Sequence, residues 1–411
     1  MLPDTVQTSP YITCILPGAR LRVVYMTDTR GPAHPVLTDP GEAAFGVIGL
    51  DRKVHWQPDI EGLGALEAAA AEPVATRNLQ AQYGENIVAG LFSRGWLQHP
   101  SDLCREYWFR TAQIEVTAHC NWGCRFCPVA TDPKPKATMP LSLFEEIISK
   151  LTPYEDIKFV TFHFYNEPTL DLFFEDRIRI LARYGMKLSL STNASGLTPA
   201  KIKALRDNDV LHHLIVNMPS LDEKEFNDLS GSRTYRMCLK NLEAAISEIG
   251  PITLSTNGIG EAQRRNVAAL RARFEPLGVQ VSAPETCDRA GAVTNEYGQN
   301  FRKEGRLNGC SWPVNHAHFS VSGDMFICCN DYWQREKFGN IRDGSIHEVM
   351  TSPAAIRLRR RVFGIDEAPP DYICRACHDQ KVDFMQRQFR PPASFPLLPG
   401  CAAAGKSGKV S

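Results

Sequence analysis

The sequence has no excess of charge of either sign. Its 411 residues include 46 Lys and Arg and 46 Asp and Glu, so the formal net charge is zero. Nucleic acids and acidic membrane surfaces attract proteins largely through a positive electrostatic field. We therefore expect no nucleic-acid partner and no membrane partner.

The sequence also lacks a long apolar run and a secretion signal. No stretch approaches the roughly 18 apolar residues that suggest a membrane span. The N-terminal MLPDTVQTSPYITC has no charged segment followed by an apolar one, as a signal peptide would have. We expect a cytoplasmic protein. Its composition, 43% hydrophobic and 22% charged, is that of an ordinary globular chain of about two or three domains.

Cysteine, by contrast, is abundant and clustered. The 13 cysteines include tight groups at Cys120, Cys124 and Cys127, at Cys328 and Cys329, and at Cys374 and Cys377. In a reducing compartment, such grouping favours metal ligands over a disulfide framework.

The first cysteine group has no fourth member. The segment HCNWGCRFC, residues 119–127, has CxxxCxxC spacing, whereas a closed zinc site or an electron-transfer cluster normally takes four protein ligands. Three cysteines leave one iron of a four-iron four-sulfur cluster without a protein ligand, and that iron can bind a small molecule. A zinc knuckle completed by His119 or by a distant residue is the alternative.

The middle of the chain alternates β-like runs with amphipathic segments. The runs are AQIEV, FVTFHFY, KLSLST, LHHLIVNM, ITLST and VQVSA, and segments such as LSLFEEIISKL and PAKIKALRDN separate them. Six consecutive βα units predict a parallel sheet covered by helices, either doubly wound or an incomplete barrel. Chemistry then lies at the carboxyl ends of the strands, and the cysteine triplet follows the first run.

These features resemble the radical S-adenosylmethionine (SAM) superfamily. In that family CxxxCxxC follows the first strand, an aromatic residue precedes the third cysteine, and the open iron binds SAM. Cys120, Cys124 and Cys127 match the cluster ligands, and Phe126 matches the aromatic residue. The resemblance implies an α/β fold, with a partial (β/α)6 TIM-like barrel at residues 108–300. It also implies reductive cleavage of SAM to a 5'-deoxyadenosyl radical, which abstracts hydrogen from a substrate C–H bond.

A second signature follows the second strand run. Family members have GGEP there, and its glutamate holds the SAM amino group; this chain has Tyr165-Asn166-Glu167-Pro168, with Asn166 in place of the second glycine. The family positions ribose and carboxylate at the next two strand ends, and many relatives have an arginine further on. The SAM contacts so implied are Asn166, Glu167, Pro168, Ser191, Asn193, Asn217 and Arg233. Turn and cap chemistry favours the same residue types.

The C-terminal third contains a second cysteine set. Cys310, Gly323 and Cys328 form CxnGxxxxC, and a CxxC pair follows. The pattern is similar to SPASM/twitch extensions, here residues 301–390. The resemblance implies one auxiliary four-iron four-sulfur cluster, bound by Cys310, Cys328, Cys374 and Cys377, whereas zinc is the alternative for two cysteine pairs. Cys329 would point to the other side of its strand, so we expect it to be a spectator.

Residues 1–107 lie outside the barrel. They are weakly similar to small winged-helix domains that bind leader peptides by adding them as a strand, and an unrelated N-terminal cap is the alternative. The first interpretation makes the substrate a precursor peptide, and the second leaves a small molecule. A flavodoxin- or ferredoxin-type reductant is implied as a further partner.

The implied function is that of a radical SAM oxidoreductase or maturase that oxidises, cross-links or epimerises a ribosomally made peptide. One alternative is a dehydrogenase or dehydratase of a sugar or aminocyclitol; another is a non-catalytic iron-sulfur carrier or sensor, which would not bind SAM. Beyond the last run, Cys287 is a candidate hydrogen donor, Asp288 a candidate base and Arg289 a candidate substrate or SAM anchor. A buried thiol and a capping carboxylate are the simpler alternatives.

Near the C-terminus, GCAAAGKS at residues 400–407 satisfies the phosphate-loop pattern GxxxxGK[ST]. A phosphate loop needs a preceding strand and a following helix, and the sequence predicts neither here. We expect residues 391–411 to form a disordered tail.

Overall fold

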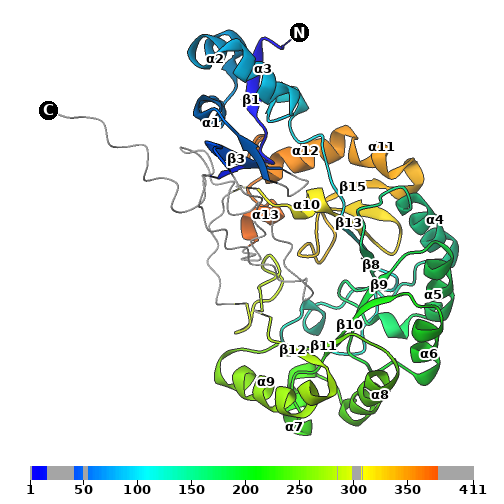
Figure 1. Cartoon of the computed structure of the whole chain (residues 1–411). Coiled ribbons are helices and arrows are strands. Elements are labelled where there is room, and N and C mark those ends of the chain that lie inside the picture. The colour runs from blue at the N-terminus through cyan, green and yellow to red at the C-terminus, as the bar shows by residue number, and fades with distance from the viewer. Residues whose placement is uncertain are drawn as a thin grey trace.

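The computed structural model describes residues 2–15, 41–49, 54–284, 286–298, 307 and 309–377. Figure 1 shows the N-terminal elements at one end, a crescent of strands and helices, and C-terminal elements between them. The expected tail and GCAAAGKS lie outside the described residues. Among the helices that the structure describes, none is long and apolar enough to cross a membrane.

Six parallel strands form the centre of the molecule. They are β7 (Thr111–Ile114), β8 (Phe159–Thr161), β9 (Leu188–Thr192), β10 (Leu211–Asn217), β11 (Ile252–Ser255) and β12 (Gln280–Ser282), and they lie side by side in chain order. The expected α/β fold with a partial barrel is confirmed.

Helices cover the outer side of this sheet (Figure 1). They are α4 (Leu141–Leu151), α5 (Phe174–Arg183), α6 (Pro199–Asp207), α7 (Glu223–Ser230), α8 (Tyr235–Glu248) and α9 (Gly260–Phe274). Alternate strand residues such as Ala112, Ile114 and Leu190 are fully buried in the core that these helices share. In α4, Phe144, Ile147 and three other turn-spaced residues give the matching apolar face. Burying each such side chain contributes about 1.5–3 kcal/mol.

The other strand residues face the concave side and are largely polar. Gln113 on β7 lies beside Thr161 on β8 in register. Farther along the sheet, His213 Nε2 lies 2.8 Å from Thr253 Oγ1. Because side chains alternate between the two faces of a strand, the inner surface offers hydroxyl, amide and imidazole groups to whatever the barrel encloses.

The C-terminal elements continue the same sheet. Strand β13 (His316–Phe319) pairs in parallel with β7, and β14 (Asp324–Phe326) and β15 (Lys337–Asn340) follow antiparallel, for nine strands in all. The accompanying helices are α10 (Trp312–Asn315), η5 (Ile341–Asp343), α11 (Ile346–Met350), α12 (Pro353–Val362) and α13 (Ile373–Ala376). The second cysteine set is therefore attached directly to the barrel.

His318 on β13 gives the fold a pH dependence. Its side chain is 1% exposed, and burial lowers its pKa from 6.5 to about 3. The unfolded chain therefore binds the proton more strongly, and stability falls as pH drops below about 6.5. Between about pH 7 and pH 5 the loss should be about 2 kcal/mol, at about 1.4 kcal/mol per pKa unit.

The check is chemical denaturation of the wild type and of His318→Phe at both pH values. The aromatic replacement keeps a ring beside Trp312 and Phe326, whose centroids lie 5.7 and 5.6 Å from that of His318. It should remove about 2 kcal/mol of the acid-induced loss. An equal loss in both proteins would show that His318 does not titrate in this range.

The N-terminal region has a separate core, built around Val6, Phe45, Val47, Leu66 and Leu97. One three-stranded sheet contains β5 (Val74–Ala75), β1 (Thr5–Thr8) and β6 (Leu97–Gln98), and the other contains β2 (Thr13–Ile15), β3 (Phe45–Ile48) and β4 (Val54–Gln57). The helices are α1 (Ile60–Ala68), α2 (Thr76–Tyr83) and α3 (Glu85–Ser93).

A buried arginine joins this region to the C-terminal elements. Arg359 of α12 is 1% exposed and donates to the carbonyl oxygens of Cys104 and Met350, each at 2.7 Å. Nearby, the ring of Tyr11 packs against that of Phe363 with centroids 5.1 Å apart. Since Cys104 follows the short helix η1 (Pro100–Asp102), the linker into the barrel is fixed against α12.

Candidate functional site

The first three cysteines lie in the loop between β7 and α4, which includes η2 (Pro128–Ala130). Burial raises the pKa of all three thiols, that of Cys120 to about 12. Cys127 and Cys120 also raise the pKa of Cys124, so the three thiols are electrostatic neighbours. Such thiols stay protonated until a metal displaces the protons.

The end of α7 holds this loop. The N–H groups of Gly123 and Arg125 donate to the carbonyl oxygens of Ser230 and Leu229, at 3.0 and 3.1 Å. Gly231 has φ +61°, and a Cβ there would lie 2.5 Å from the oxygen of Gly123. A glycine after a helix is a known helix-end signal, but nothing in the sequence indicates that Gly231 contacts the cysteine loop.

Asn121, next to the first cysteine, organises a second contact. Its Oδ1 accepts from Asn193 Nδ2 at 2.9 Å, and its Nδ2 donates to Ser195 Oγ at 2.9 Å. The backbone N–H of Ser195 in turn donates to Asn193 Oδ1 at 2.8 Å. The structure therefore places the amide of Asn193, a predicted SAM contact, against the cysteine loop.

Glu167 connects three strand ends. It is 1% exposed. Its Oε2 accepts from the backbone N–H of Asn193 at 2.6 Å, and its Oε1 accepts from Thr192 Oγ1 at 2.5 Å and from the backbone N–H of Thr169 at 3.0 Å. The Glu167 N–H donates to the carbonyl of His119 at 2.8 Å. Burial raises the pKa of the carboxyl group, and these hydrogen bonds oppose that rise.

The neighbouring signature residues are engaged locally. The Asn166 side chain accepts from the N–H of Phe164 at 2.6 Å and donates to the carbonyl of Phe162 at 3.1 Å. It therefore completes the end of its own strand. Pro168 is buried and begins the short helix η3 (Pro168–Leu170), which Glu167 caps.

The three remaining predicted SAM contacts differ in position. Ser191 and Asn217 lie half-buried at the carboxyl ends of the adjacent strands β9 and β10. Asn217 Oδ1 accepts from Asn257 Nδ2 at 3.2 Å. Arg233 is exposed between α7 and α8.

The segment after β12 returns to the cysteine loop. Asn295 Nδ2 donates to the carbonyl of Arg125 at 2.7 Å, and the rings of Phe126 and Tyr297 lie 6.0 Å apart. Residues 289–291 all have positive φ, from 51° to 87°, so the backbone turns sharply there.

This turn brings the predicted triad close to the loop. Cys287 and Asp288 are 5% and 2% exposed. The guanidinium carbon of Arg289 lies 6.0 Å from the ring centroid of Tyr165, and its charge lowers the otherwise raised pKa of Cys127. A positive side chain thus faces the third cysteine.

The cysteines of the second set also lie close together. Burial raises the pKa of Cys328 well above its usual value, and Cys329, Cys377, Cys374 and Cys310 raise it further. These cysteines are therefore neighbours although they are far apart in sequence. Gly323, with φ +85°, turns the hairpin between β13 and β14 and packs against Leu143 of α4.

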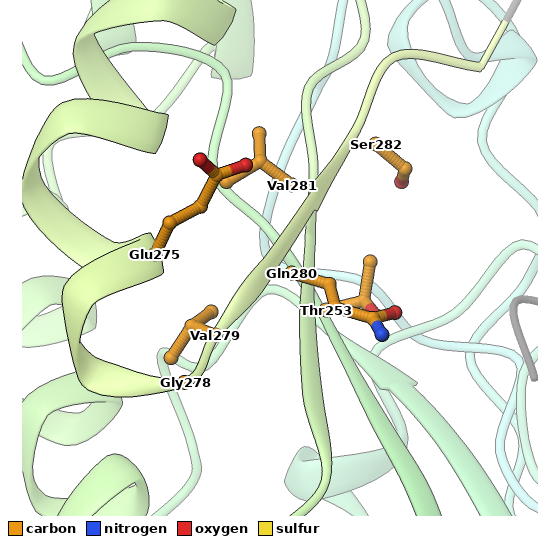
Figure 2. Close-up of a pocket in the computed structure, with 7 residues that line it drawn as sticks. All are labelled: Thr253, Glu275, Gly278, Val279, Gln280, Val281 and Ser282. Carbon is orange, nitrogen blue, oxygen red and sulfur yellow. The ribbon is translucent and has the colours of Figure 1, made fainter.

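A separate cavity of about 520 Å³ opens at the β12 edge of the sheet (Figure 2). Its lining consists of Thr253, Glu275, Gly278, Val279, Gln280, Val281 and Ser282, which include the short helix η4 (Glu275–Leu277). None of these is a predicted site residue, and most lie before or within β12. The cysteines instead lie at the carboxyl ends of the strands, so we place the chemistry there.

Two family models match the chain. The radical SAM superfamily model matches residues 114–270. The chain belongs to the radical SAM superfamily. A second model, of the SPASM iron-sulfur cluster-binding domain, matches residues 310–378. The two matches cover both cysteine sets and confirm that SAM and iron-sulfur clusters are the cofactors of this radical SAM enzyme.

Two curated proteins are similar to this radical SAM chain. The S-adenosyl-L-methionine-dependent 2-deoxy-scyllo-inosamine dehydrogenase of Niallia circulans is 20% identical over 283 residues, 67% of this chain and 94% of that protein. The tungsten-containing aldehyde ferredoxin oxidoreductase cofactor-modifying protein of Pyrococcus furiosus is 29% identical over 94 residues, 23% of this chain and 26% of that protein.

A solved structure has a similar fold over most of the chain. Streptococcus suis SuiB bound to precursor peptide SuiA is 10% identical, with a TM-score of 0.51, and the likeness covers 86% of this chain and 90% of that one. At this identity the likeness concerns the fold alone.

Both donor sets of this radical SAM chain fit iron-sulfur clusters. The three barrel thiols form one group and the four C-terminal thiols another, as the pKa shifts that they cause in one another indicate. Across the described ranges, no group of three or more His, Cys, Asp or Glu is arranged to hold a single metal ion. Clusters need thiolate donors, and these two sets supply them.

Proposed function

We propose that the chain matures a ribosomally made peptide by radical SAM chemistry. An edge strand in the N-terminal region supports a peptide substrate. Strand β4 pairs only with β3 among the strands that the structure describes, and its His55 is exposed. A strand edge of this kind can accept an extended peptide as a further strand.

The comparisons support this proposal through the fold. The likeness to SuiB covers 86% of this chain, which is more than the barrel and C-terminal elements together, so it extends into the N-terminal region. The match to the dehydrogenase of Niallia circulans covers 94% of that protein but only 67% of this chain. A third of this chain therefore has no counterpart there.

In this proposal, Cys120, Cys124 and Cys127 hold the SAM-site cluster, and Cys310, Cys328, Cys374 and Cys377 hold the auxiliary cluster. Bound there, the groups supply the 5'-deoxyadenosyl radical and an acceptor for the electron of an oxidised substrate. Glu167 orients the SAM amino group, with Ser191, Asn217 and Arg233 as further candidate contacts.

The remaining roles concern the substrate. Arg289 holds an anionic group of the substrate or of SAM beside the third cysteine. Asp288 accepts a proton when the reaction is an oxidation, and Cys287 returns hydrogen when it is an epimerisation. Phe126 and Tyr297 exclude water from this side of the loop.

The test is an anaerobic assay with SAM, dithionite and precursor peptides encoded beside the gene. The expected product is a peptide that has lost two hydrogen atoms or changed one stereocentre, formed with 5'-deoxyadenosine. His55→Pro should disrupt the backbone hydrogen bonding of the β4 edge. It should lower peptide modification about ten-fold or more, since about 1.4 kcal/mol of binding free energy corresponds to ten-fold. Peptide-independent SAM cleavage should be unchanged.

Oxidation of an aminocyclitol alcohol is the second candidate. The 20% identity across 94% of the Niallia circulans dehydrogenase supports it, as does the polar inner face of the barrel. 2-Deoxy-scyllo-inosamine is the probe in the same assay. Its oxidation, unaffected by His55→Pro, would replace the peptide proposal. Fully loaded iron with no 5'-deoxyadenosine would instead favour a carrier.

A further inference from the structure

We propose that Lys134 and Glu115 couple the two iron-sulfur sites, so that filling the auxiliary site strengthens retention of the SAM-site cluster. The residues involved are Glu115, Lys134, Tyr165, Tyr332 and Gln334, which we call the clasp. The inference rests on the ligand assignment proposed above and is independent of the substrate.

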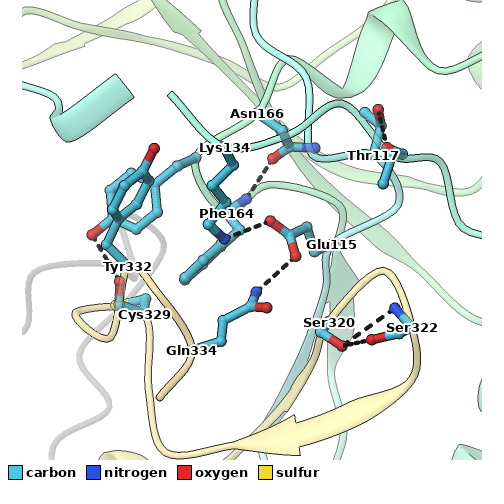
Figure 3. Close-up of polar contacts among 12 residues, drawn as sticks. Glu115, Thr117, Lys134, Phe164, Asn166, Ser320, Ser322, Cys329, Tyr332 and Gln334 are labelled. Carbon is cyan, nitrogen blue, oxygen red and sulfur yellow. Dashed lines mark hydrogen bonds and ion pairs between the residues drawn. The ribbon is translucent and has the colours of Figure 1, made fainter. Parts of the chain in front are cut away.

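A buried ion pair forms the centre of the clasp (Figure 3). Lys134 Nζ lies 3.0 Å from Glu115 Oε1, and the two side chains are 12% and 2% exposed. Gln334 Nε2 donates to the other oxygen of Glu115 at 2.7 Å. Lys134 follows the barrel cysteines, and Gln334 follows Cys328, so the pair joins the two cluster loops.

Aromatic rings enclose the lysine. Its Nζ lies 4.3 Å from the ring centroid of Phe164 and 5.2 Å from that of Tyr332. Phe164 comes directly before the SAM-binding signature, whereas Tyr332 belongs to the auxiliary loop. An ammonium group over two ring faces is stabilised by both, so Lys134 contacts both sides at once.

Two hydroxyl groups cross between the loops. Tyr332 Oη donates to the carbonyl of Asp132 at 2.5 Å, and Tyr165 Oη donates to the carbonyl of Cys329 at 2.8 Å. Cys329 directly follows the auxiliary ligand Cys328. The backbone beside each cluster site is thus hydrogen-bonded to a side chain from the other.

These contacts have an energetic consequence. When a cluster orders the auxiliary loop, Tyr332 and Gln334 are held in place to support Lys134, Glu115 and the barrel loop. The second cluster then binds a loop that is already ordered, which is positive coupling. Because coupling is reciprocal, the SAM-site cluster must also help to retain the auxiliary one.

The experiment uses four full-length proteins, reconstituted and compared anaerobically without peptide. They are the wild type, Cys374→Ala/Cys377→Ala, Glu115→Gln/Lys134→Met, and the combination of both pairs. The double clasp variant removes both charges together, which avoids leaving one buried charge unpaired. The measurement is the fraction of protein whose reduced-cluster EPR spectrum changes when SAM is added.

Loss of the auxiliary ligands should lower that fraction about five-fold in the wild-type background, at the low end of typical coupling. In the clasp variant, loss of the auxiliary ligands should cause no further decrease in the fraction. The reciprocal measurement is iron release from the auxiliary site to a chelator, which should be faster in Cys120→Ala/Cys124→Ala/Cys127→Ala. An equal effect in both backgrounds, or none in the wild type, would overturn the proposal.

Lys150→Met is the matched control. Lys150 Nζ also crosses from the barrel to the C-terminal elements, where it donates to the carbonyls of Ile341 and Gly344 at 2.6 and 2.9 Å. It lies on α4, outside both cysteine loops, so Lys150→Met should leave the coupling intact. Loss of coupling in this variant would assign the effect to general packing between the two parts. A failed peptide assay would not affect either outcome.

Discussion

Gly231→Ala is expected to empty the SAM site while leaving the auxiliary site filled. The left-handed backbone costs an alanine about 1–2 kcal/mol, and its Cβ would lie 2.5 Å from the carbonyl oxygen of Gly123. Gly123 lies between Cys120 and Cys124, so relief of the clash must move the loop. Iron content should fall from about eight to about four per chain, and 5'-deoxyadenosine formation should disappear.

Gly185→Ala separates the clash from the backbone strain. Gly185 follows α5 with φ +66°, and nothing lies within 4 Å of the position of a Cβ. This variant should lose a similar amount of stability, about 1–2 kcal/mol, and keep all its iron. If Gly231→Ala also keeps about eight irons, the end of α7 does not hold the loop.

Glu167→Gln is expected to weaken SAM binding about ten-fold or more. An amide offers one acceptor oxygen where donors from Asn193, Thr192 and Thr169 converge on both oxygens of Glu167. At least one buried donor then loses its partner, at a cost of about 1–3 kcal/mol, and the negative charge that we propose to face the SAM amino group is lost. Equilibrium dialysis with SAM measures the dissociation constant directly.

Glu145→Gln is the matched control, because the Glu145 side chain is 39% exposed on α4 and pairs with Arg183. It should bind SAM as the wild type does. Iron content distinguishes the two effects of Glu167→Gln. Full iron with weak SAM binding supports a role at the SAM amino group, whereas lost iron assigns Glu167 to supporting the cysteine loop through His119.

The sequence predicts the barrel well because its signals are local. Apolar runs such as KLSLST match strands within a few residues, and the cysteine spacing identifies the loop without any structure. Contacts between distant segments have no such signal. Glu115 and Gln334 are 219 residues apart, and nothing in the pattern around either residue indicates the other.

Polar residues at strand ends are a second feature whose contacts the sequence does not predict. Asn166 and Asn193 are SAM contacts that the family resemblance implies, and their contact with SAM remains a prediction. The structure adds that the Asn166 side chain binds the carbonyl of Phe162, just after β8, and that the Asn193 side chain binds Asn121, because a short amide satisfies whichever polar group is nearest. The N-terminal strands are two to four residues long, too short for an alternating pattern to identify.

The pairing of β13 with β7 has a consequence for synthesis of the chain. The two strands are neighbours in the sheet, yet β13 begins about 200 residues after β7. At a translation rate of about 5–20 residues per second, the edge of β7 waits roughly 10–40 seconds for its partner. During that interval the nascent barrel exposes an open strand edge, which is a site of aggregation. Expression of a form that ends before β13 should therefore give aggregated protein, however complete its barrel.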